Sequence, residues 1–407
     1  MDWVLRSQTK PQSRLPTSGL SLQPTHNSLR ILGVLRDRSC SVAELERRTG
    51  LSQLTVRRHV GVLEAQGLVS PAGLGRSNGG RQPRLFTLVS DSRVALAIHL
   101  QFPGAKVATV GLNGKIIAMR HAPAHGREDP VVVLDRLGSA AESFLRRVPV
   151  GRLIGVGVAL PGYADLTRGV SLRIGRAPAW RDVPVSDVLS RRLGLPTLLV
   201  HDTAAMALAE SDAGDARGQQ HFAFVLAEEG VSAGLFLGGT VYQGAFGNAG
   251  LIGHMTVRPN GRLCFCGSAG CAEAYASARA LAERPTELAP EIVGHPVSYQ
   301  DVIRQALEGR EPFRTVLDEA LELLGIAIAN LAKILEVRTV FVGGYPARLP
   351  EAARAKIFGT AHAHLQPPLK VNFDIRYSRV LEAGLVGAAI PVIRRFFGVP
   401  TTTRWAS

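Results

Sequence analysis

Residues 250–277 read GLIGHMTVRPNGRLCFCGSAGCAEAYAS and contain three of the four cysteines of the chain, Cys264, Cys266 and Cys271. His254 lies ten residues before the first of these cysteines. Three thiolates and one imidazole complete a tetrahedral shell for zinc and leave no open position for a reacting water. The pattern therefore predicts a structural Zn²⁺ ion that fastens a loop. The alternative is three buried thiols that bind no metal.

Two glycines, Gly267 and Gly270, separate the second cysteine from the third. The chain must reverse direction there if all three sulfurs are to face one ion. Glycine adopts a positive φ without steric cost, so we expect both residues to lie in tight turns.

The residues Gly253-His254 and Cys264-Phe-Cys-Gly-Ser-Ala-Gly-Cys-Ala-Glu273 resemble the zinc signature of the ROK family, which groups sugar-responsive repressors with sugar kinases. Other landmarks of that family follow in the same order over residues 92–396. The resemblance implies an α/β protein in which an N-terminal winged helix-turn-helix precedes an actin-like (ribonuclease H-like) two-lobed ATPase-type fold. We therefore expect a disordered basic arm at 1–26, a winged helix-turn-helix at 27–90, a first lobe at 91–202 completed by 379–397, and a second lobe with the zinc loop at 203–378.

Positive charge is concentrated at the N-terminus. Residues 1–90 contain 13 Lys and Arg against 5 Asp and Glu, a net charge of +8 out of +14 for the chain. Such a basic segment is typical of nucleic-acid binding, although a solvated basic surface without a partner is the alternative. The sequence has no signal peptide and no apolar run of membrane-spanning length, and its cysteines form no disulfide framework. These features predict a cytoplasmic protein without a membrane partner.

Capping signals divide the basic segment into short helices. Asn27 is expected to cap a first helix. Ser41 and Glu44 form a capping box that opens a second helix, which ends near Gly50. Ser52 then caps a third helix that ends at about residue 66. Two short helices joined by a tight turn are typical of a helix-turn-helix.

On the third helix Val56, Val60 and Leu63 share one face and should pack inward. A strand pair at 67–70 and 84–88 is expected to flank a glycine-rich wing loop at 71–83. The predicted DNA-binding residues are Ser52, Gln53, Thr55, Arg57 and Arg58 on the helix, with Arg76 and Arg81 on the wing. Gln53, Arg57 and Arg58 are placed to read bases, or alternatively phosphate, whereas Ser52 and Thr55 suit phosphate.

Two segments depart from the pattern of the family's kinases. At the first phosphate loop the chain reads His99-Leu-Gln-Phe-Pro-Gly104, without the acidic residue and the paired glycines. At the second it reads Leu226-Ala-Glu-Glu-Gly-Val-Ser-Ala-Gly234, where two carboxylates would repel a triphosphate. The sequence therefore predicts that the chain does not bind ATP and is not an enzyme.

The effector cleft that the resemblance implies has candidate polar contacts in Asp202, Asn248, His254 and Glu273. Asp202 matches the catalytic aspartate of the kinases, but it is equally suited to cap a helix from Thr203. Leu251 stands where sugar-binding members have a glutamate, and the loss of this acceptor would weaken sugar binding by about 2–3 kcal/mol.

These observations predict a transcriptional regulator, most simply a repressor, whose ROK domain senses a sugar, a sugar phosphate or a related metabolite. It would bind an inverted-repeat operator in double-stranded DNA as a homodimer or homotetramer, because one helix-turn-helix reads only a half-site. The alternatives are a ligand-independent or metal-responsive regulator and a DNA-binding sugar kinase.

Overall fold

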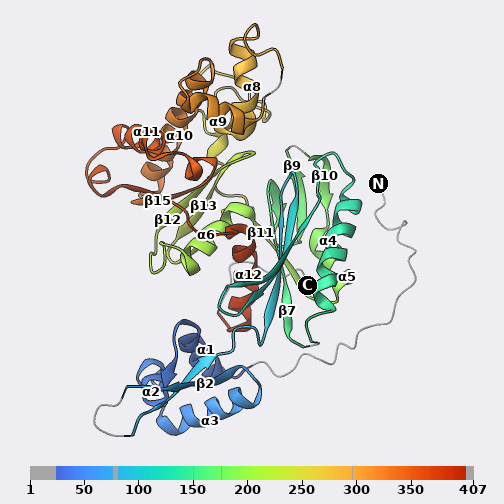
Figure 1. Cartoon of the computed structure of the whole chain (residues 1–407), viewed down its shortest axis with the longest axis vertical. Coiled ribbons are helices and arrows are strands. Elements are labelled where there is room, and N and C mark those ends of the chain that lie inside the picture. The colour runs from blue at the N-terminus through green and yellow to red at the C-terminus, as the bar shows by residue number, and fades with distance from the viewer. Residues whose placement is uncertain (1–23, 77–80, 150, 176, 296, 400–407) are drawn as a thin grey trace.

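The computed structural model describes residues 24–399 except 77–80, 150, 176 and 296. It contains a small N-terminal domain, here called the head, and a two-lobed body (Figure 1). Of the predicted arm, residues 1–23 lie outside the described residues, as do the wing tip and the tail from residue 400. No helix in the described part of the chain is long and apolar enough to cross a bilayer.

The head is a winged helix-turn-helix. Its helices α1 (His26–Asp37), α2 (Val42–Thr49) and α3 (Gln53–Ala65) pack on a small sheet of order β1-β3-β2, formed by Cys40–Ser41, Arg84–Leu88 and Val69–Leu74. The capping box of Ser41 and Glu44 is confirmed, and so is the cap that Ser52 provides to Thr55. The prediction for Asn27 is wrong, because the Thr25 side chain accepts from the Ser28 N–H and α1 begins at His26. Strand β2 also extends to Leu74, into the predicted loop.

The first lobe is built on a five-stranded sheet of order β11-β7-β4-β5-β6. Strands β4, β5 and β6 form an antiparallel meander, and β7 and β11 add in parallel to β4. A small antiparallel sheet of β8, β9 and β10 extends this lobe. The bounds are β4 Val94–Leu100, β5 Ala105–Gly111, β6 Ile116–Ala122, α4 Pro130–Leu145, β7 Leu153–Leu160, β8 Tyr163–Asp165, β9 Val170–Ile174, β10 Ala177–Val183, α5 Val185–Leu193 and β11 Thr197–His201.

The second lobe repeats this topology in its sheet of order β14-β13-β12-β15-β16. Again a meander is extended by two parallel strands. The bounds are β12 Phe222–Ala227, β13 Val231–Leu237, β14 Thr240–Tyr242, η2 Ile252–His254, α7 Glu273–Ala276, α8 Ala278–Leu288, α9 Tyr299–Leu307, α10 Phe313–Leu335, β15 Thr339–Gly344, η3 Tyr345–Arg348, α11 Glu351–Ala363, η4 Lys370–Asn372 and β16 Asp374–Tyr377. The two matching sheets confirm the predicted actin-like fold.

Helices α6 (Asp202–Ala213) and α12 (Ala383–Phe396) lie between the two sheets (Figure 1). Helix α6 approaches α12 and β13 so closely that only glycine fits at the two points of contact. A Cβ atom on Gly387 of α12 would lie 1.7 Å from the Ala205 carbonyl oxygen of α6, and one on Gly234 of β13 would lie 2.0 Å from that of Thr203. Helix α6 is therefore packed against the second lobe and against the helix that closes the first.

Candidate metal centre and nucleic-acid interface

The four predicted metal ligands come together at the start of the second lobe's helical part. The ligand atoms of His254, Cys264, Cys266 and Cys271 all lie within 4.8 Å of one another. His254 ends the short helix η2, and isolated bridges pair Thr256 with Cys271 and fix the return of the chain. We refer to residues 254–271 as the metal loop.

The distances between these atoms fit one tetrahedral ion. Bonds of about 2.3 Å to sulfur and about 2.0 Å to nitrogen at tetrahedral angles separate two sulfurs by about 3.8 Å and sulfur from nitrogen by about 3.5 Å. The Cys266 and Cys271 sulfurs are 3.7 Å apart, and Cys264 Sγ lies 3.6 Å from His254 Nδ1. The donor set and its spacing therefore fit zinc.

The backbone of the loop agrees with this assignment. Gly267 and Gly270 have φ values of 96° and 77°, as the sequence predicts, and a Cβ on Gly270 would lie 1.8 Å from the Arg258 carbonyl oxygen. Burial, with the neighbouring Cys266 and Cys264 thiols, raises the pKa of the Cys271 thiol to about 12. A bound cation would reverse this shift, because a coordinated thiol is held as thiolate.

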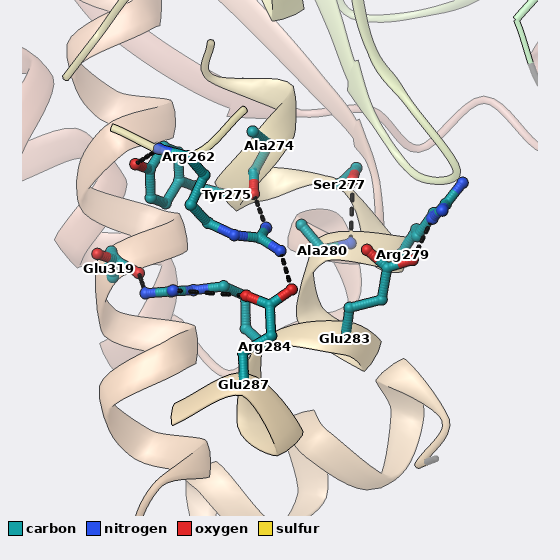
Figure 2. A network of polar contacts seen from close by, with 10 residues as sticks. All are labelled: Arg262, Ala274, Tyr275, Ser277, Arg279, Ala280, Glu283, Arg284, Glu287 and Glu319. Atoms are coloured by element: carbon teal, nitrogen blue, oxygen red, sulfur yellow. Dashed lines mark hydrogen bonds and ion pairs between the residues drawn. The ribbon is translucent and has the colours of Figure 1, made fainter. Parts of the chain in front are cut away.

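An ion-pair network holds the helices behind the metal loop (Figure 2). Arg262 of the loop donates to the Ala274 carbonyl and pairs with Glu287 of α8. Its backbone N–H donates to the Tyr275 hydroxyl at 2.7 Å. Arg284 pairs with Glu319 of α10. These contacts join the metal loop to α8 and join α8 to α10. Arg262 and Ala274 also line a cavity of about 260 Å³.

The structure places the remaining cleft candidates on different elements. Asp202 is buried at the end of β11, where burial raises the pKa of its carboxyl group against the opposing effect of His201. Its proposed role as a helix cap is wrong, since His201 occupies the cap position and Asp202 is the first residue of α6. The Asp202 carboxylate instead accepts from the adjacent Thr203 N–H at 2.6 Å. Glu273 is buried and accepts from the Val231 N–H of the β12–β13 turn at 2.9 Å.

Asn248 joins the two lobes. Its side-chain oxygen accepts from the Ala164 N–H at 2.8 Å, and its amide nitrogen donates to the Ala164 carbonyl at 3.1 Å. Ala164 belongs to β8 of the first lobe, whereas Asn248 precedes the metal loop of the second. The amide group that the sequence offers as a ligand contact therefore binds protein backbone.

Phe265 makes a second contact between the lobes. Its ring lies so close to Gly175, in the β9–β10 turn, that a Cβ atom there would be 2.6 Å from a ring carbon. The same ring meets the His254 imidazole edge to face, with centroids 5.2 Å apart. The metal loop thus touches the first lobe through an aromatic ring that lies beside a candidate metal ligand.

The turn that would hold phosphate in a kinase is occupied by protein contacts. Glu228, at the β12–β13 turn, accepts from the Tyr299 hydroxyl at 2.8 Å and from Arg348 at 2.9 Å. The Tyr345 ring lies beside that of Tyr299, with centroids 6.3 Å apart, and is fully buried. At the first phosphate-loop position Pro103 contributes no N–H donor. Both observations disfavour a bound triphosphate.

Helix α3 lies on the far side of the head from the body (Figure 1). Val56, Val60 and Leu63 are buried, as the sequence predicts. The candidate base-reading side chains Gln53, Arg57 and Arg58 are exposed. Ser52 and Thr55 hydroxyls lie 2.9 Å apart at the N-terminus of the helix. Arg76 and Arg81 are exposed on either side of the wing tip.

An ion pair that the sequence does not reveal joins the head to the body. Arg36 of α1 donates through Nη1 to Asp212 of α6 at 2.9 Å, pairs with its second oxygen, and donates through Nε to the Leu112 carbonyl at 3.0 Å. Both side chains are largely shielded from solvent, at 21% and 10% exposure. A second pair, Arg217 with Asp37, lies nearby and is more exposed. No sequence signal identifies the Arg36 pair, because its residues are 176 positions apart.

Comparison with known proteins identifies the same two parts. A family model described as the ROK family matches residues 103–395, and a MarR family model matches residues 18–77. A putative xylose repressor of Caldicellulosiruptor sp. (strain Rt8B.4) is 30% identical over 329 residues, which cover 78% of this chain and 82% of the relative.

Solved structures share the fold. A ROK family transcriptional regulator, a homologue of the E. coli MLC protein, superposes with a TM-score of 0.76 at 22% identity and covers 92% of this chain and 97% of its own. A ROK hexokinase from Thermus thermophilus has a TM-score of 0.63 at 30% identity and covers 73% of this chain and 97% of its own. The family model spans most of the chain and every strand of the body's two five-stranded sheets except β4, and the chain belongs to the ROK family.

Proposed function

We propose that this protein is a DNA-binding transcriptional repressor whose body senses a sugar or a related small metabolite and has no kinase activity. One observation supports this most directly: an exposed, capped recognition helix with Gln53, Arg57 and Arg58 stands on a body whose phosphate turn is filled by Glu228, Tyr299 and Arg348. The similarity to a xylose repressor supports the same reading and makes xylose the first sugar to test.

The recognition helix would enter the major groove with its N-terminus, where Arg pairs with guanine and Gln with adenine. A single head reads one half-site, so we propose that a homodimer or homotetramer binds an inverted repeat. Such a regulator would act on DNA in the cytoplasm.

Helix α6 offers a physical route from the cleft to the head. It begins at Asp202, which the resemblance places at the effector cleft, and its last turn contains Asp212, which holds Arg36 of the head. At 1.5 Å per residue these two carboxylates are about 15 Å apart along one rigid helix. An effector that moves one lobe against the other would shift α6 and thereby reorient the head.

The predicted Zn²⁺, held by His254, Cys264, Cys266 and Cys271, would have a structural role in this proposal. It would fix the loop that presents Phe265 to the first lobe and leads into Glu273. A closed four-ligand shell would perform no hydrolysis. In this proposal the ion makes the metal loop rigid, and side chains of the protein, not the ion, contact the effector.

Fluorescence anisotropy on operator candidates tests the proposal. We expect salt-sensitive binding to specific duplexes, a loss of about 5- to 100-fold in Arg57→Ala, and weaker binding on addition of xylose or another sugar. Arg338→Ala, an exposed arginine before β15, serves as the control for net charge. If the protein binds no duplex better than random DNA, the proposal that it is a repressor is refuted. Sugar-dependent ATP turnover would favour the kinase alternative.

A further inference from the structure

A second, larger cavity lies between the head and the body, away from the effector cleft. It measures about 1180 Å³ and is bounded by α1 of the head, the β5–β6 turn, the end of α6, the β13–β14 turn and the end of α12. No residue of α3 or of the described part of the wing lines it. The cavity is therefore separate from the surface that would meet DNA.

The walls of this cavity are strongly basic. Its cationic side chains are Arg30, Arg36, Lys115, Arg217 and Arg394, and its carboxylates are Asp37 and Asp212. Both carboxylates are already engaged, since Arg36 binds both oxygens of Asp212 and Arg217 pairs with Asp37. Three of the five cations thus have no carboxylate of their own among the lining residues.

Arg394 is the most informative of these three. It lies in the last turn of α12 and is half-buried. Its guanidinium group donates no hydrogen bond to any of the residues that the structure describes. Burial lowers the pKa of its guanidinium group; Asp212 opposes this shift and Arg36 reinforces it. One carboxylate therefore faces two guanidinium groups, and a partly desolvated positive charge without a counter-charge of its own is energetically unfavourable.

The other two unmatched cations approach from different parts. Lys115 belongs to the β5–β6 turn, whose Gly114 has a φ of 79° and lies against the Arg36–Asp212 pair. Arg30 belongs to the head and donates only to the Thr49 carbonyl among the described residues. An anion in the cavity would meet guanidinium groups from both the head and the body. Guanidinium and ammonium groups gathered in this way bind phosphate oxygens well.

We propose that this cavity binds a small free phosphate-type dianion, inorganic phosphate or a phosphorylated metabolite, which fastens the head to the body. Two negative charges match the excess of cations better than one, and the volume leaves room for an organic group. Because the anion would bridge α1 to α12 and the β5–β6 turn, its occupancy would set how firmly the head is docked. This site and its ligand are independent of the sugar cleft.

Isothermal titration of the full-length protein with inorganic phosphate, at constant ionic strength, tests the proposal without DNA. We expect one saturable site, weakened on the order of tenfold by Arg394→Gln, which removes charge-assisted hydrogen bonds. Arg395→Gln, on the same helix turn but outside the cavity lining, should bind phosphate like the natural chain. Lys115→Gln, in an exposed turn where substitution should not impair folding, should also weaken binding.

Hydrogen exchange supplies a second readout. Phosphate should slow exchange of the amides in α1 and the β5–β6 turn of the natural chain, and not in Arg394→Gln. Non-saturable binding, or equal loss in Arg394→Gln and Arg395→Gln, would overturn the proposal. A phosphorylated metabolite that binds more tightly than inorganic phosphate would identify the organic part of the ligand. These measurements are unaffected by whether the protein represses transcription.

Discussion

The metal loop and the head–body junction both join separate parts of the fold, but they are built differently. The metal loop gathers four ligands from 18 residues and presses Phe265 onto the first lobe. The junction relies on Arg36 and Asp212, which are 176 residues apart, and on a basic cavity with too few carboxylates. The metal loop is formed by residues that are close together in the sequence, whereas the junction is an electrostatic contact between residues that are far apart in it.

The difference indicates which contact can be adjusted. A tetrahedral metal site is either complete or broken, since loss of one ligand removes the ion. Ion pairs contribute smaller free energies than a metal site, and those near the surface depend on salt and on bound anions. We infer that the metal loop serves as a fixed point of the cleft, whereas the junction is the graded contact through which head position responds to solution conditions.

The largest effect is expected from breaking the metal loop. Cys271→Ala should abolish stoichiometric zinc and lower the stability of the second lobe by more than about 3 kcal/mol, because metal-binding free energy is also folding free energy. Elemental analysis and thermal unfolding measure both. Cys40→Ala removes a buried thiol of the head and should leave the zinc content unchanged. Full zinc content in Cys271→Ala would contradict the assigned ligand set.

A smaller effect is expected at the junction. Asp212→Asn leaves the Arg36 guanidinium shielded with a neutral partner and should cost about 1–3 kcal/mol of head–body docking. Limited proteolysis between residues 88 and 94 and hydrogen exchange of α1 report it. Asp37→Asn, whose pair with Arg217 is about half exposed on each side, should change docking by less than about 1 kcal/mol. Equal effects of the two substitutions would show that the Arg36–Asp212 pair contributes no more to docking of the head than the Arg217–Asp37 pair does.

The smallest effect is expected at the cleft. Asn248→Ala removes two hydrogen bonds to Ala164 and should destabilise the contact between the lobes by about 1 kcal/mol. Faster hydrogen exchange in β8, with unchanged zinc content, is the expected signature. Asn113→Ala, which loses only a turn contact to the Lys115 N–H, is the control. Unchanged exchange in β8 would mean that Phe265 and its neighbours hold the lobes without Asn248.

Much of this architecture is visible in the sequence because it depends on residues close together in the chain. Capping at Ser41 and Ser52 and the buried stripe of α3 follow from spacing and helix periodicity. The errors have a local cause as well. Thr25 and Asn27 are both residue types that cap helices well, and in the structure Thr25 is the cap while Asn27 lies within the first turn of α1. At Asp202, the extended backbone of His201 took the cap position and moved the carboxylate one residue into the helix.

The cleft shows where such reasoning ends. Resemblance nominates Asp202, Asn248, His254 and Glu273 as ligand contacts, but it does not report what else each side chain binds. In the folded chain Asn248 spans the lobes and Glu273 supports the β12–β13 turn. Nor does the sequence indicate that Tyr299 and Arg348 converge on Glu228 to fill a phosphate turn. Hydrogen-bond partners distant in sequence decide whether a polar group is available.

The sequence by itself indicated the four candidate metal ligands and the winged helix-turn-helix, because both depend on residue types at short spacing, where covalent geometry limits the arrangements. The departures from the two phosphate loops of the kinases were visible in the sequence only through its resemblance to the ROK family. Only the tertiary structure decided the Arg36–Asp212 pair, the contacts of the metal loop with the first lobe and the basic cavity beside α12. Those features arise where separate elements meet. Their energies depend on burial and on which charges face one another, and neither quantity exists until the chain has folded.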